Sequence, residues 1–230
     1  MNNQWDTYAE LYDKGIGIQG DTLHTTLIDP LIVQFLGERK CDTILDAGCG
    51  NGYLLKKLAD KARVVIGIDS SKKLIDAAAR NISGLSYASV IYGDIAKRIP
   101  VSSGSCDVVI ANMVLQYLPS LEQFAAESGR ILKKEGGLIV ILDHPGHALF
   151  LRAQELAGQR NDKFLTSASY FTQGKRKKKS LWDKATLEYC HRTIEAYINP
   201  FTPYFHLNCL TELSENGEMP RILGLKWSKV

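Results

Sequence analysis

The sequence lacks the features that mark secreted, membrane-spanning and zinc-binding proteins. Its first residues, MNNQWDTYAE, contain no basic stretch followed by an apolar segment, so we expect no signal peptide. The longest apolar runs, such as LIVIL at 138–142, have the length of a strand and are too short to span a membrane. The cysteines are odd in number and include no Cys-x-x-Cys pair; they are at positions 41, 49, 106, 190 and 209. We therefore expect a cytoplasmic protein with reduced thiols and without a bound metal.

The sequence also lacks a strong charge of either sign. Lys and Arg total 28 and Asp and Glu total 25, a balance of +3. The single run KRKKK, Lys175 to Lys179, accounts for the excess, because without it 23 basic residues would face 25 acidic ones, a balance of −2. A nucleic-acid-binding protein normally spreads Lys and Arg over a whole face, so this pattern argues against a nucleic-acid partner. We interpret the run as a solvated, mobile loop; the alternative is an electrostatic handle for an acidic substrate, RNA or a membrane surface.

From residue 43 to residue 142 the chain alternates short apolar runs with amphipathic segments. The apolar runs are typical of strands buried on both faces of a parallel sheet and cover 43–47, 63–69, 86–94, 106–112 and 137–143. The segments between them have helical spacing and cover 53–60, 71–82 and 121–134. Ser70 or Ser71 can cap the second helix, and Gly136 suits the left-handed residue that ends the third. This order predicts an α/β fold with a doubly wound, mostly parallel sheet.

The two ends of the chain depart from this alternation. Residues 1–20 are expected to be irregular or weakly helical, and 20–37 helical with a division at Pro30. The long excursion after the fifth strand is rich in aromatic residues and histidines, which suggests a lid or a substrate pocket. We expect a single domain, 1–230. It would consist of an N-terminal lid (1–40), a cofactor-binding core (41–143), a substrate-pocket insertion (144–203) and closing strands (204–230).

A glycine-rich turn, DAGCGNG, follows the first predicted strand. Gly48, Gly50 and Gly52 let the backbone turn tightly and approach a ligand, and the helix that follows offers unpaired N–H groups. The third glycine of a dinucleotide fingerprint would fall at Tyr53, and no Gly-Lys-Ser/Thr follows that could form a phosphate-binding loop. The turn therefore predicts a nucleotide-like ligand without a pyrophosphate.

Three acidic residues end three successive predicted strands. Asp46 precedes the first glycine, where a carboxylate would repel a pyrophosphate but suit an amino group. Asp69 lies where a carboxylate accepts hydrogen bonds from ribose hydroxyls, and Asp94 is placed to accept one from an adenine amino group. Each alone could be a turn or helix-cap residue, but together they favour a ligand with an adenine, a ribose and an amine.

With these residues, the chain resembles the class I S-adenosylmethionine-dependent methyltransferases, and within them the small-molecule type that includes the ubiquinone and menaquinone methylases (methyltransferase type 11). The resemblance rests on LDAGCGNG, GIDSS, YGDIAKRIP, DVVIANMVLQYL and ILKKEGGLIVI, in family order and spacing. It implies a Rossmann-like, seven-stranded sheet with an antiparallel closing strand and a helical lid insertion. It also implies S-adenosylmethionine as the cofactor and S-adenosylhomocysteine as the product.

The resemblance assigns residues to each part of the cofactor. Asp46, Gly48, Cys49 and Gly50 would contact the methionine part, and Asp69 and Ser70 the ribose. Asp94 and Ile95 would contact the adenine, and the backbone of Asn112 and Met113 would lie beside the sulfonium. Gln116 and Tyr117 fall where the family often places residues near the transferred methyl group. Tyr8 and Tyr12 would close over the cofactor. The Cys49 side chain itself is interpreted as small filler and not as a nucleophile.

Methyl transfer from a sulfonium needs alignment of the acceptor and exclusion of water, and it needs a base only if the acceptor must lose a proton. The candidates for catalysis are His144, with His147 beside it, His191 and Tyr117. The alternatives are structural: a turn hydrogen bond for His144 and a packing role for His191 in a predicted helix. His24 is interpreted as a surface or packing residue.

These observations predict an S-adenosylmethionine-dependent methyltransferase that acts on a small organic acceptor. The alternatives are an RNA or protein methyltransferase and a non-catalytic S-adenosylmethionine-binding protein. A nicotinamide dehydrogenase is disfavoured by Tyr53 and Asp46. The sequence predicts neither the acceptor nor the oligomeric state.

Overall fold

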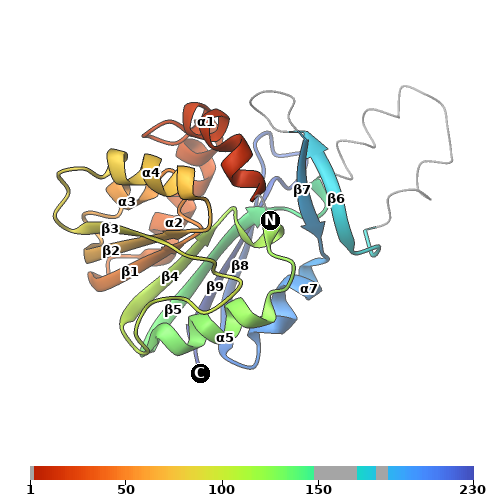
Figure 1. Cartoon of the computed structure of the whole chain (residues 1–230). Coiled ribbons are helices and arrows are strands. Elements are labelled where there is room, and N and C mark those ends of the chain that lie inside the picture. The colour runs from red at the N-terminus through yellow and green to blue at the C-terminus, as the bar shows by residue number, and fades with distance from the viewer. Residues whose placement is uncertain (1–2, 148–169, 180–185) are drawn as a thin grey trace, which may run out of the picture.

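A seven-stranded sheet forms the centre of the computed structural model, which describes residues 3–147, 170–179 and 186–230 (Figure 1). Its strands are β1 (Cys41–Ala47), β2 (Ala62–Asp69), β3 (Ala88–Tyr92), β4 (Cys106–Asn112), β5 (Leu132–Asp143), β8 (Phe205–Leu213) and β9 (Ile222–Lys229). They lie in the order β3-β2-β1-β4-β5-β9-β8. β1 to β5 run parallel, and β9 runs antiparallel to both β5 and β8. The predicted doubly wound sheet, with its antiparallel closing strand, is confirmed.

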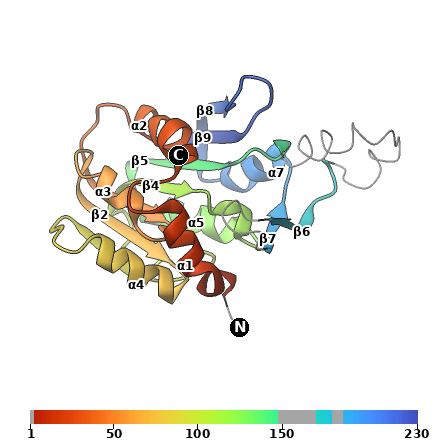
Figure 2. The same cartoon turned by 90° about the horizontal axis from the view of Figure 1, so that it is seen from above.

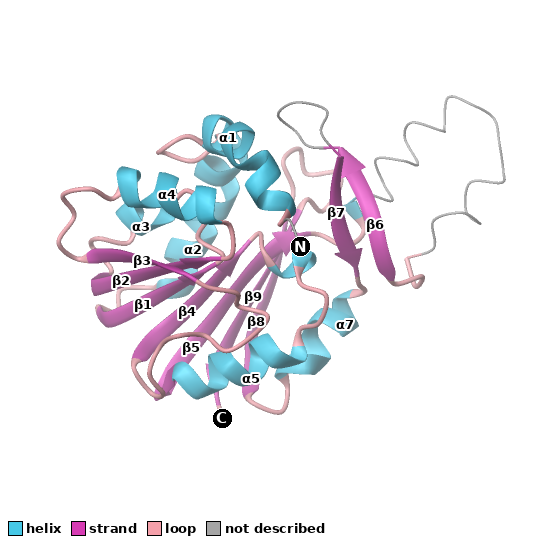
Figure 3. Ribbon diagram, in the orientation of Figure 1, coloured by secondary structure: helices cyan, strands magenta, loops and turns pink. Residues whose placement is uncertain are grey.

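Helices cover both faces of this sheet (Figure 3). On one face lie α2 (Asp29–Leu36), α3 (Tyr53–Lys57) and α4 (Lys72–Asn81); on the other lie α5 (Glu122–Ile131) and α7 (Ile194–Ile198). Ser71 caps α4, because its hydroxyl accepts a hydrogen bond from the Leu74 amide. The two apolar layers are separate: Leu31 and Leu54 belong to the first, and Phe124 and Trp227 to the second. Burial of the sheet on both faces explains the continuous apolar runs of its strands.

The prediction for Gly136 was wrong. α5 ends at Ile131, and β5 begins at Leu132 and runs through Gly136, which does not have a left-handed backbone. The register between β4 and β5 shifts here, from Cys106 opposite Leu132 to Val108 opposite Gly137. A Cβ on Gly136 would lie 2.9 Å from the Leu132 side chain, so glycine provides room for this irregular strand rather than ending a helix.

The N-terminal segment is more regular than expected. Residues Gln4–Ile16 form helix α1, where irregular or weakly helical structure was predicted. Its ends explain the difference, because the Asn3 side chain accepts a hydrogen bond from the Trp5 amide and Gly17 ends the helix with a φ of 63°. A π-helix, η1 (His24–Ile28), leads into α2, and Pro30 occupies the first turn of α2. The helical backbone is continuous through Pro30, which lies just after the change from π-helix to α-helix, so Pro30 does not divide the helix.

The described part of the insertion is mainly strand, in contrast to the predicted helical lid. β6 (Gly174–Lys179) and β7 (Thr186–His191) form an antiparallel hairpin, followed by α7 and the 3₁₀ helix η4 (Asn199–Phe201). His191 is the last residue of β7 and is not in a helix. The KRKKK run forms β6 and is not a loop, because it pairs with TLEYCH, which contains β-branched and aromatic residues. The predictions for 148–169 and 180–185 lie outside the described residues.

The hairpin lies beyond the carboxyl ends of the parallel strands, as Figures 1 and 2 show from two directions. This is the edge at which open α/β sheets bind ligands. Within the described ranges, the helices are all too short or too polar to cross a bilayer.

Candidate active site

The glycine turn between β1 and α3 has the backbone that its sequence predicts. Gly48, Gly50 and Gly52 have φ values of 82°, 54° and 77°, in the left-handed region that favours glycine. A Cβ on Gly48 would come within 2.4 Å of Val114, and one on Gly50 within 2.7 Å of the Tyr12 hydroxyl. The turn is therefore packed closely on both sides and admits no other side chain at these positions without movement.

Asp46 is a buried carboxylate beside this turn. Burial, followed by the charge of Asp69, raises the pKa of Asp46 to about 8. Asp46 pairs in register with Ile110, so Asn112, two residues further along β4, projects from the same face of the sheet. Asp46 Oδ1, Asn112 Oδ1 and Gln116 Oε1 are all buried, and among the described residues they have no hydrogen-bond partner. Unpaired buried acceptors are rare, so these three oxygens require a ligand that donates hydrogen bonds.

Asp69 is held by the backbone at the end of β2. It accepts hydrogen bonds from the Gly50 amide, at 3.0 Å, and from the Ser71 amide, at 2.8 Å. Burial raises the pKa of Asp69, and these backbone donors oppose that shift. Since a carboxylate oxygen has two acceptor positions, each oxygen of Asp69 can still accept a ribose hydroxyl.

The predicted adenine residues follow β3. Asp94 Oδ1 accepts a hydrogen bond from the Ala96 amide at 3.0 Å, and Asp94 Oδ2 lies 3.2 Å from Lys97 Nζ. Ile95 is buried against the core, and both residues line the same cleft as Asp69. Met113, predicted beside the sulfonium, also lines this cleft; with a φ of 55° it is the single described non-glycine residue with a positive φ. Such backbones persist where surrounding structure holds them, often at functional sites.

Helix α1 covers this site and is fixed at both ends. At its start, Asn3 Nδ2 donates to Ser70 Oγ at 3.0 Å, so the predicted ribose-binding Ser70 already has a partner. At its end, Asn51 Nδ2 donates to Asp13 Oδ1 at 2.8 Å and to the Gly17 carbonyl at 2.9 Å. Sequence reasoning missed these bonds, because they join segments far apart in the chain.

Tyr12, rather than Tyr8, faces the site from α1. The Tyr8 hydroxyl donates to the Thr186 carbonyl at 3.1 Å, and Tyr8 does not line the cleft. Tyr12 lines it, and burial together with the charges of Asp69 and Asp46 raises the pKa of its hydroxyl well above its usual value. The prediction of an aromatic residue over the cofactor thus fits Tyr12 and not Tyr8.

Cys49 has a packing role in the turn. Its thiol is buried, does not line the cleft, and lies where a Cβ on Gly67 would come within 2.7 Å of it. Burial raises the pKa of this thiol well above its usual value, so it is not a nucleophile. This agrees with its interpretation as small filler.

One cleft of about 2070 Å³ joins most of the predicted cofactor residues to a second, more basic region; Asp46, like Tyr8 and Cys49, is not among its lining residues. The cofactor end includes Gly48, Gly50, Asp69, Ser70, Asp94 and Ile95. The second end includes Tyr117 and residues from η1, the segment after β5, the hairpin and the segment before β9; its charged and histidine side chains are Asp21, His24, Asp143, His144, His147, Arg176, Lys177, Lys178, His191, Arg192, Glu215 and Arg221.

An ion-pair cluster anchors the hairpin at this second end. Asp143, the last residue of β5, accepts from Lys178 Nζ at 2.5 Å and from the Arg221 guanidinium. Although burial opposes it, the two cations hold the pKa of Asp143 at about 2. Lys178 Nζ also lies 5.4 Å from the ring centroid of Tyr117 and 5.6 Å from that of Tyr189. Lys178 is therefore a half-buried, ion-paired part of the site, and its interpretation as a solvated loop residue was wrong.

Tyr117 lies at the junction of the two ends. Its ring packs edge-on against Trp5 of α1, at 4.8 Å between centroids. Burial raises the pKa of its hydroxyl, and the neighbouring Lys178 opposes that shift. A neutral tyrosine beside a cation is a hydrogen-bond donor at neutral pH, which suits a positioning role better than that of a base.

The two histidines that were predicted as bases are both engaged. Nδ1 of His144 accepts from the Gly146 amide at 3.1 Å, which puts the ring proton on Nε2. That Nε2 lies 2.7 Å from Glu212 Oε1, although its N–H does not point along the line to this oxygen. His144 thus has no nitrogen left to accept a proton, and its turn alternative fits better. His191 Nε2 lies 2.9 Å from the Tyr170 carbonyl, and burial lowers its pKa.

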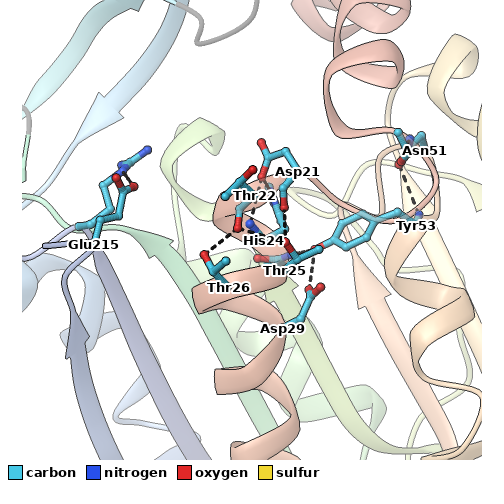
Figure 4. Close-up of polar contacts among 12 residues, drawn as sticks. Asp21, Thr22, His24, Thr25, Thr26, Asp29, Asn51, Tyr53 and Glu215 are labelled. Atoms are coloured by element: carbon cyan, nitrogen blue, oxygen red, sulfur yellow. Dashed lines mark hydrogen bonds and ion pairs between the residues drawn. The ribbon is translucent and has the colours of Figure 1, made fainter.

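His24 was interpreted as a surface or packing residue. Its side chain is 7% exposed and packs against Tyr53, which agrees with the packing alternative, and it also lines the cleft. Its Nδ1 lies 2.7 Å from Asp21 Oδ1 (Figure 4). The Asp-x-x-His spacing in the predicted helix was a signal that sequence reasoning could have used.

The residues present fit S-adenosylmethionine. The three unpaired oxygens of Asp46, Asn112 and Gln116 match an ammonium group, which is a donor only. Asp69 can accept from ribose hydroxyls, and the positive φ values of Gly48 and Gly50 allow close approach of a ligand to the backbone.

Comparison with known proteins agrees with the class that this fold and cleft define. Residues 45–140 match the model of the methyltransferase domain family. The predicted resemblance to S-adenosylmethionine-dependent methyltransferases is confirmed, and residues 45–140 are similar to the methyltransferase domain that this model describes. No residue role follows from the match itself.

The relatives in sequence and structure are as follows. A malonyl-[acyl-carrier protein] O-methyltransferase of Xylella fastidiosa (strain M23) is 30% identical over 164 residues, which cover 66% of this chain and 54% of that protein. A protein of the same name from Halalkalibacterium halodurans is 30% identical and covers 57% and 50%. The chain thus spans about half the length of these curated relatives. The crystal structure of an S-adenosylmethionine-dependent methyltransferase from Mesorhizobium loti superposes with a TM-score of 0.69 at 19% identity, covering 92% of this chain and 100% of that one, and shows the same fold.

Proposed function

We propose that the protein transfers a methyl group from S-adenosylmethionine to a small organic acceptor. The observation that carries this proposal is the single cleft that contains both most of the predicted cofactor residues, Asp69 and Asn112 among them, and the basic, histidine-rich end. A non-catalytic binding protein needs only the first of these. Here the second end is a polar, partly charged space that an acceptor can fill while it lies next to the cofactor.

In this proposal the residues hold the cofactor as follows. The oxygens of Asp46, Asn112 and Gln116 bind the ammonium of its methionine part, Asp69 binds the ribose and Asp94 the adenine. The bound cofactor supplies a methyl group that its positive sulfur activates. Trp5 and Tyr12 of α1 exclude water, and Tyr117 helps to position the acceptor. The contribution of the protein is mainly alignment, an effect that reaches several kcal/mol, up to about 7–11 in model reactions.

We further propose that the acceptor carries an anionic group. The second end is net positive, because five basic side chains line it and three acidic ones. The basic residues are Arg176, Lys177, Lys178, Arg192 and Arg221, and the acidic residues are Asp21, Asp143 and Glu215. The names of the Xylella and Halalkalibacterium relatives specify malonyl-[acyl-carrier protein] as the acceptor of those proteins, and a malonyl group bears a carboxylate. An acceptor with an anionic group is consistent with both observations.

Methyl transfer from isotopically labelled S-adenosylmethionine into an extract of the source organism tests this function. The extract is separated into small molecules, RNA and protein, and the Asp69→Ala variant serves as the control for cofactor binding. We expect label in the small-molecule fraction, with the mass shift of one methyl group. Label confined to RNA or protein would contradict the proposal and would favour exposed Lys175 and Lys177 of β6 as a docking surface.

A further inference from the structure

We propose that His24, oriented by Asp21, is the general base of the reaction and that the methylated group is one that must lose a proton, which we assign to a hydroxyl. This inference rests on the proposed function and adds to it a catalytic residue and the chemical class of the accepting atom. It assigns a role to the pair of buried His24 and half-buried Asp21, which the cofactor site does not use.

The contacts of the His24 ring fix which nitrogen carries the proton. Asp21 Oδ1 lies 2.7 Å from Nδ1 and also accepts the backbone amide of His24 at 3.0 Å. Because an ionised carboxylate can only accept, Nδ1 is the protonated nitrogen and Nε2 has the free lone pair. Among the described residues, no group forms a hydrogen bond with Nε2. This is the arrangement in which a carboxylate orients an imidazole and stabilises the imidazolium that forms when it accepts a proton.

The ring is held in place on its other side. It packs edge-on against Tyr53, with 5.2 Å between the centroids and 78° between the planes. The Tyr53 hydroxyl accepts a hydrogen bond from Asn112 Nδ2 at 2.9 Å and lies 3.3 Å from Asp29 Oδ1. Asn112 ends β4 directly before Met113, the predicted neighbour of the sulfonium. Tyr53 therefore links the His24 ring to Asn112, on the cofactor side of the cleft.

The surroundings of His24 open into the acceptor end. His24 is the first residue of the π-helix η1, and π-helical turns are rare and occur frequently at functional sites. Figure 4 shows Asp21, Thr22 and Thr26 around His24, with Glu215 on the opposite side; all of these residues line the cleft. An acceptor held between η1 and Glu215 would lie against the imidazole.

The other histidines of the cleft are less suited to this role. Nδ1 of His147 lies 3.2 Å from the Pro220 carbonyl, which orients the ring without a negative charge. Burial and the cation of Arg221 lower the pKa of His147, so its protonated form is disfavoured. His144 has no free acceptor nitrogen, as described above, and the described partner of His191 is a carbonyl. Of these four rings, that of His24 combines a carboxylate on one nitrogen with a free second nitrogen.

The step balances as follows. An acceptor hydroxyl oxygen forms the new bond to the methyl carbon, the bond between sulfur and that carbon breaks, and its electron pair stays on sulfur. The hydroxyl proton moves to Nε2 of His24 and is later released to solvent. A carboxylate acceptor would need no such base, because it is already ionised at neutral pH. The requirement for His24 thus distinguishes a hydroxyl from a carboxylate acceptor.

The first test compares methyl transfer to the small-molecule fraction of the extract by His24→Asn and wild-type protein. Asparagine can still donate to Asp21 but cannot accept the proton, so we expect the rate to fall about 10²–10⁴-fold. S-adenosylhomocysteine should bind both proteins with the same affinity in calorimetry. His206→Asn, which alters an exposed histidine outside the cleft, is the matched control and should keep the wild-type rate. A wild-type rate in His24→Asn would overturn the inference and favour a carboxylate acceptor.

Two measurements keep the inference testable if that variant is poorly folded. Nitrogen-15 NMR of the wild-type protein with S-adenosylhomocysteine should show His24 protonated at Nδ1 and bare at Nε2, and Asp21→Asn should abolish this preference. In His24→Ala, added imidazole should restore part of the lost rate, which a purely structural role would not produce. A ring protonated at Nε2 alone would refute the inference. If the wild-type protein labels no small molecule, the proposed function fails, while the NMR result still decides the state of His24.

Discussion

Asp46 makes a quantitative prediction about cofactor binding. Its pKa is about 8 in the ligand-free protein, so at pH 7 the side chain is mainly protonated. An ammonium group at its unpaired oxygen favours the ionised form and lowers this pKa. Binding therefore releases a proton. Below pH 8, each unit by which the pH falls weakens binding by about 1.4 kcal/mol. We expect the Kd for S-adenosylhomocysteine to fall about tenfold for each unit by which the pH rises between about pH 6 and pH 7.5, because Asp46 of the free protein ionises by itself near pH 8.

Calorimetry in two buffers of different ionisation enthalpy measures both quantities in the same titrations. The wild-type protein should release close to one proton at about pH 6.5. Asp46→Asn keeps an acceptor oxygen but cannot ionise, so its Kd should not depend on pH in this range. Asp42→Asn, on the exposed start of β1, is the control and should behave like the wild type. A pH-independent Kd in the wild type, or proton release that persists in Asp46→Asn, would refute the assignment of Asp46 to the ammonium.

Three further predictions concern the cofactor site and the hairpin anchor. Asp69→Ala should weaken binding of S-adenosylhomocysteine by about 1–3 kcal/mol in calorimetry, the range of charge-assisted hydrogen bonds; unchanged affinity would exclude the ribose assignment. Asp143→Asn should lower the free energy of unfolding by about 1–3 kcal/mol in denaturant titrations, because the half-buried cations of Lys178 and Arg221 lose their charged partner. The pKa of Asp143 is depressed to about 2, so its stabilisation is present above about pH 4 and should be lost in the wild type as pH falls through about 2. Gly50→Ala should cost about 1–2 kcal/mol of stability, because alanine disfavours the left-handed backbone, and its Cβ should displace Tyr12 and so weaken ligand binding. Gly84→Ala is the control: its φ is 84° and the space around it is open, so it should change stability only.

The fold could be predicted from the sequence because its signals are local. Apolar runs such as CDVVIAN mark strands buried on both faces, and the predicted bounds of that strand, 106–112, agree with the structure. The glycine turn and the acids at the strand ends were equally readable, since a parallel sheet brings its carboxyl ends together at one edge. Where a local pattern was ambiguous, as at Gly136, tertiary packing decided the outcome.

The acceptor end could not be predicted in the same way, because long-range contacts build it. KRKKK has no strand propensity, but Lys178 is neutralised by Asp143, which lies 35 residues away in the chain. His191 lies in a segment with helical spacing, yet its pairing with Gly174 makes that segment a strand. The burial of His24 depends on Tyr53 and on the rest of the α2–α3 face. Single-sequence patterns contain none of this information.

The N-terminal helix also affects the order in which the protein can assemble during synthesis. Gln4 exchanges two hydrogen bonds with the backbone of Glu188, 184 residues later in the chain. The ribosome therefore synthesises α1, which covers the site, long before it synthesises β7, the strand to which α1 is bonded. The parallel core can form in the meantime, because most of its contacts lie within residues 41–143. The nascent chain thus passes through a stage in which the sheet is complete up to β5 and its ligand edge is still open to other molecules in the cell.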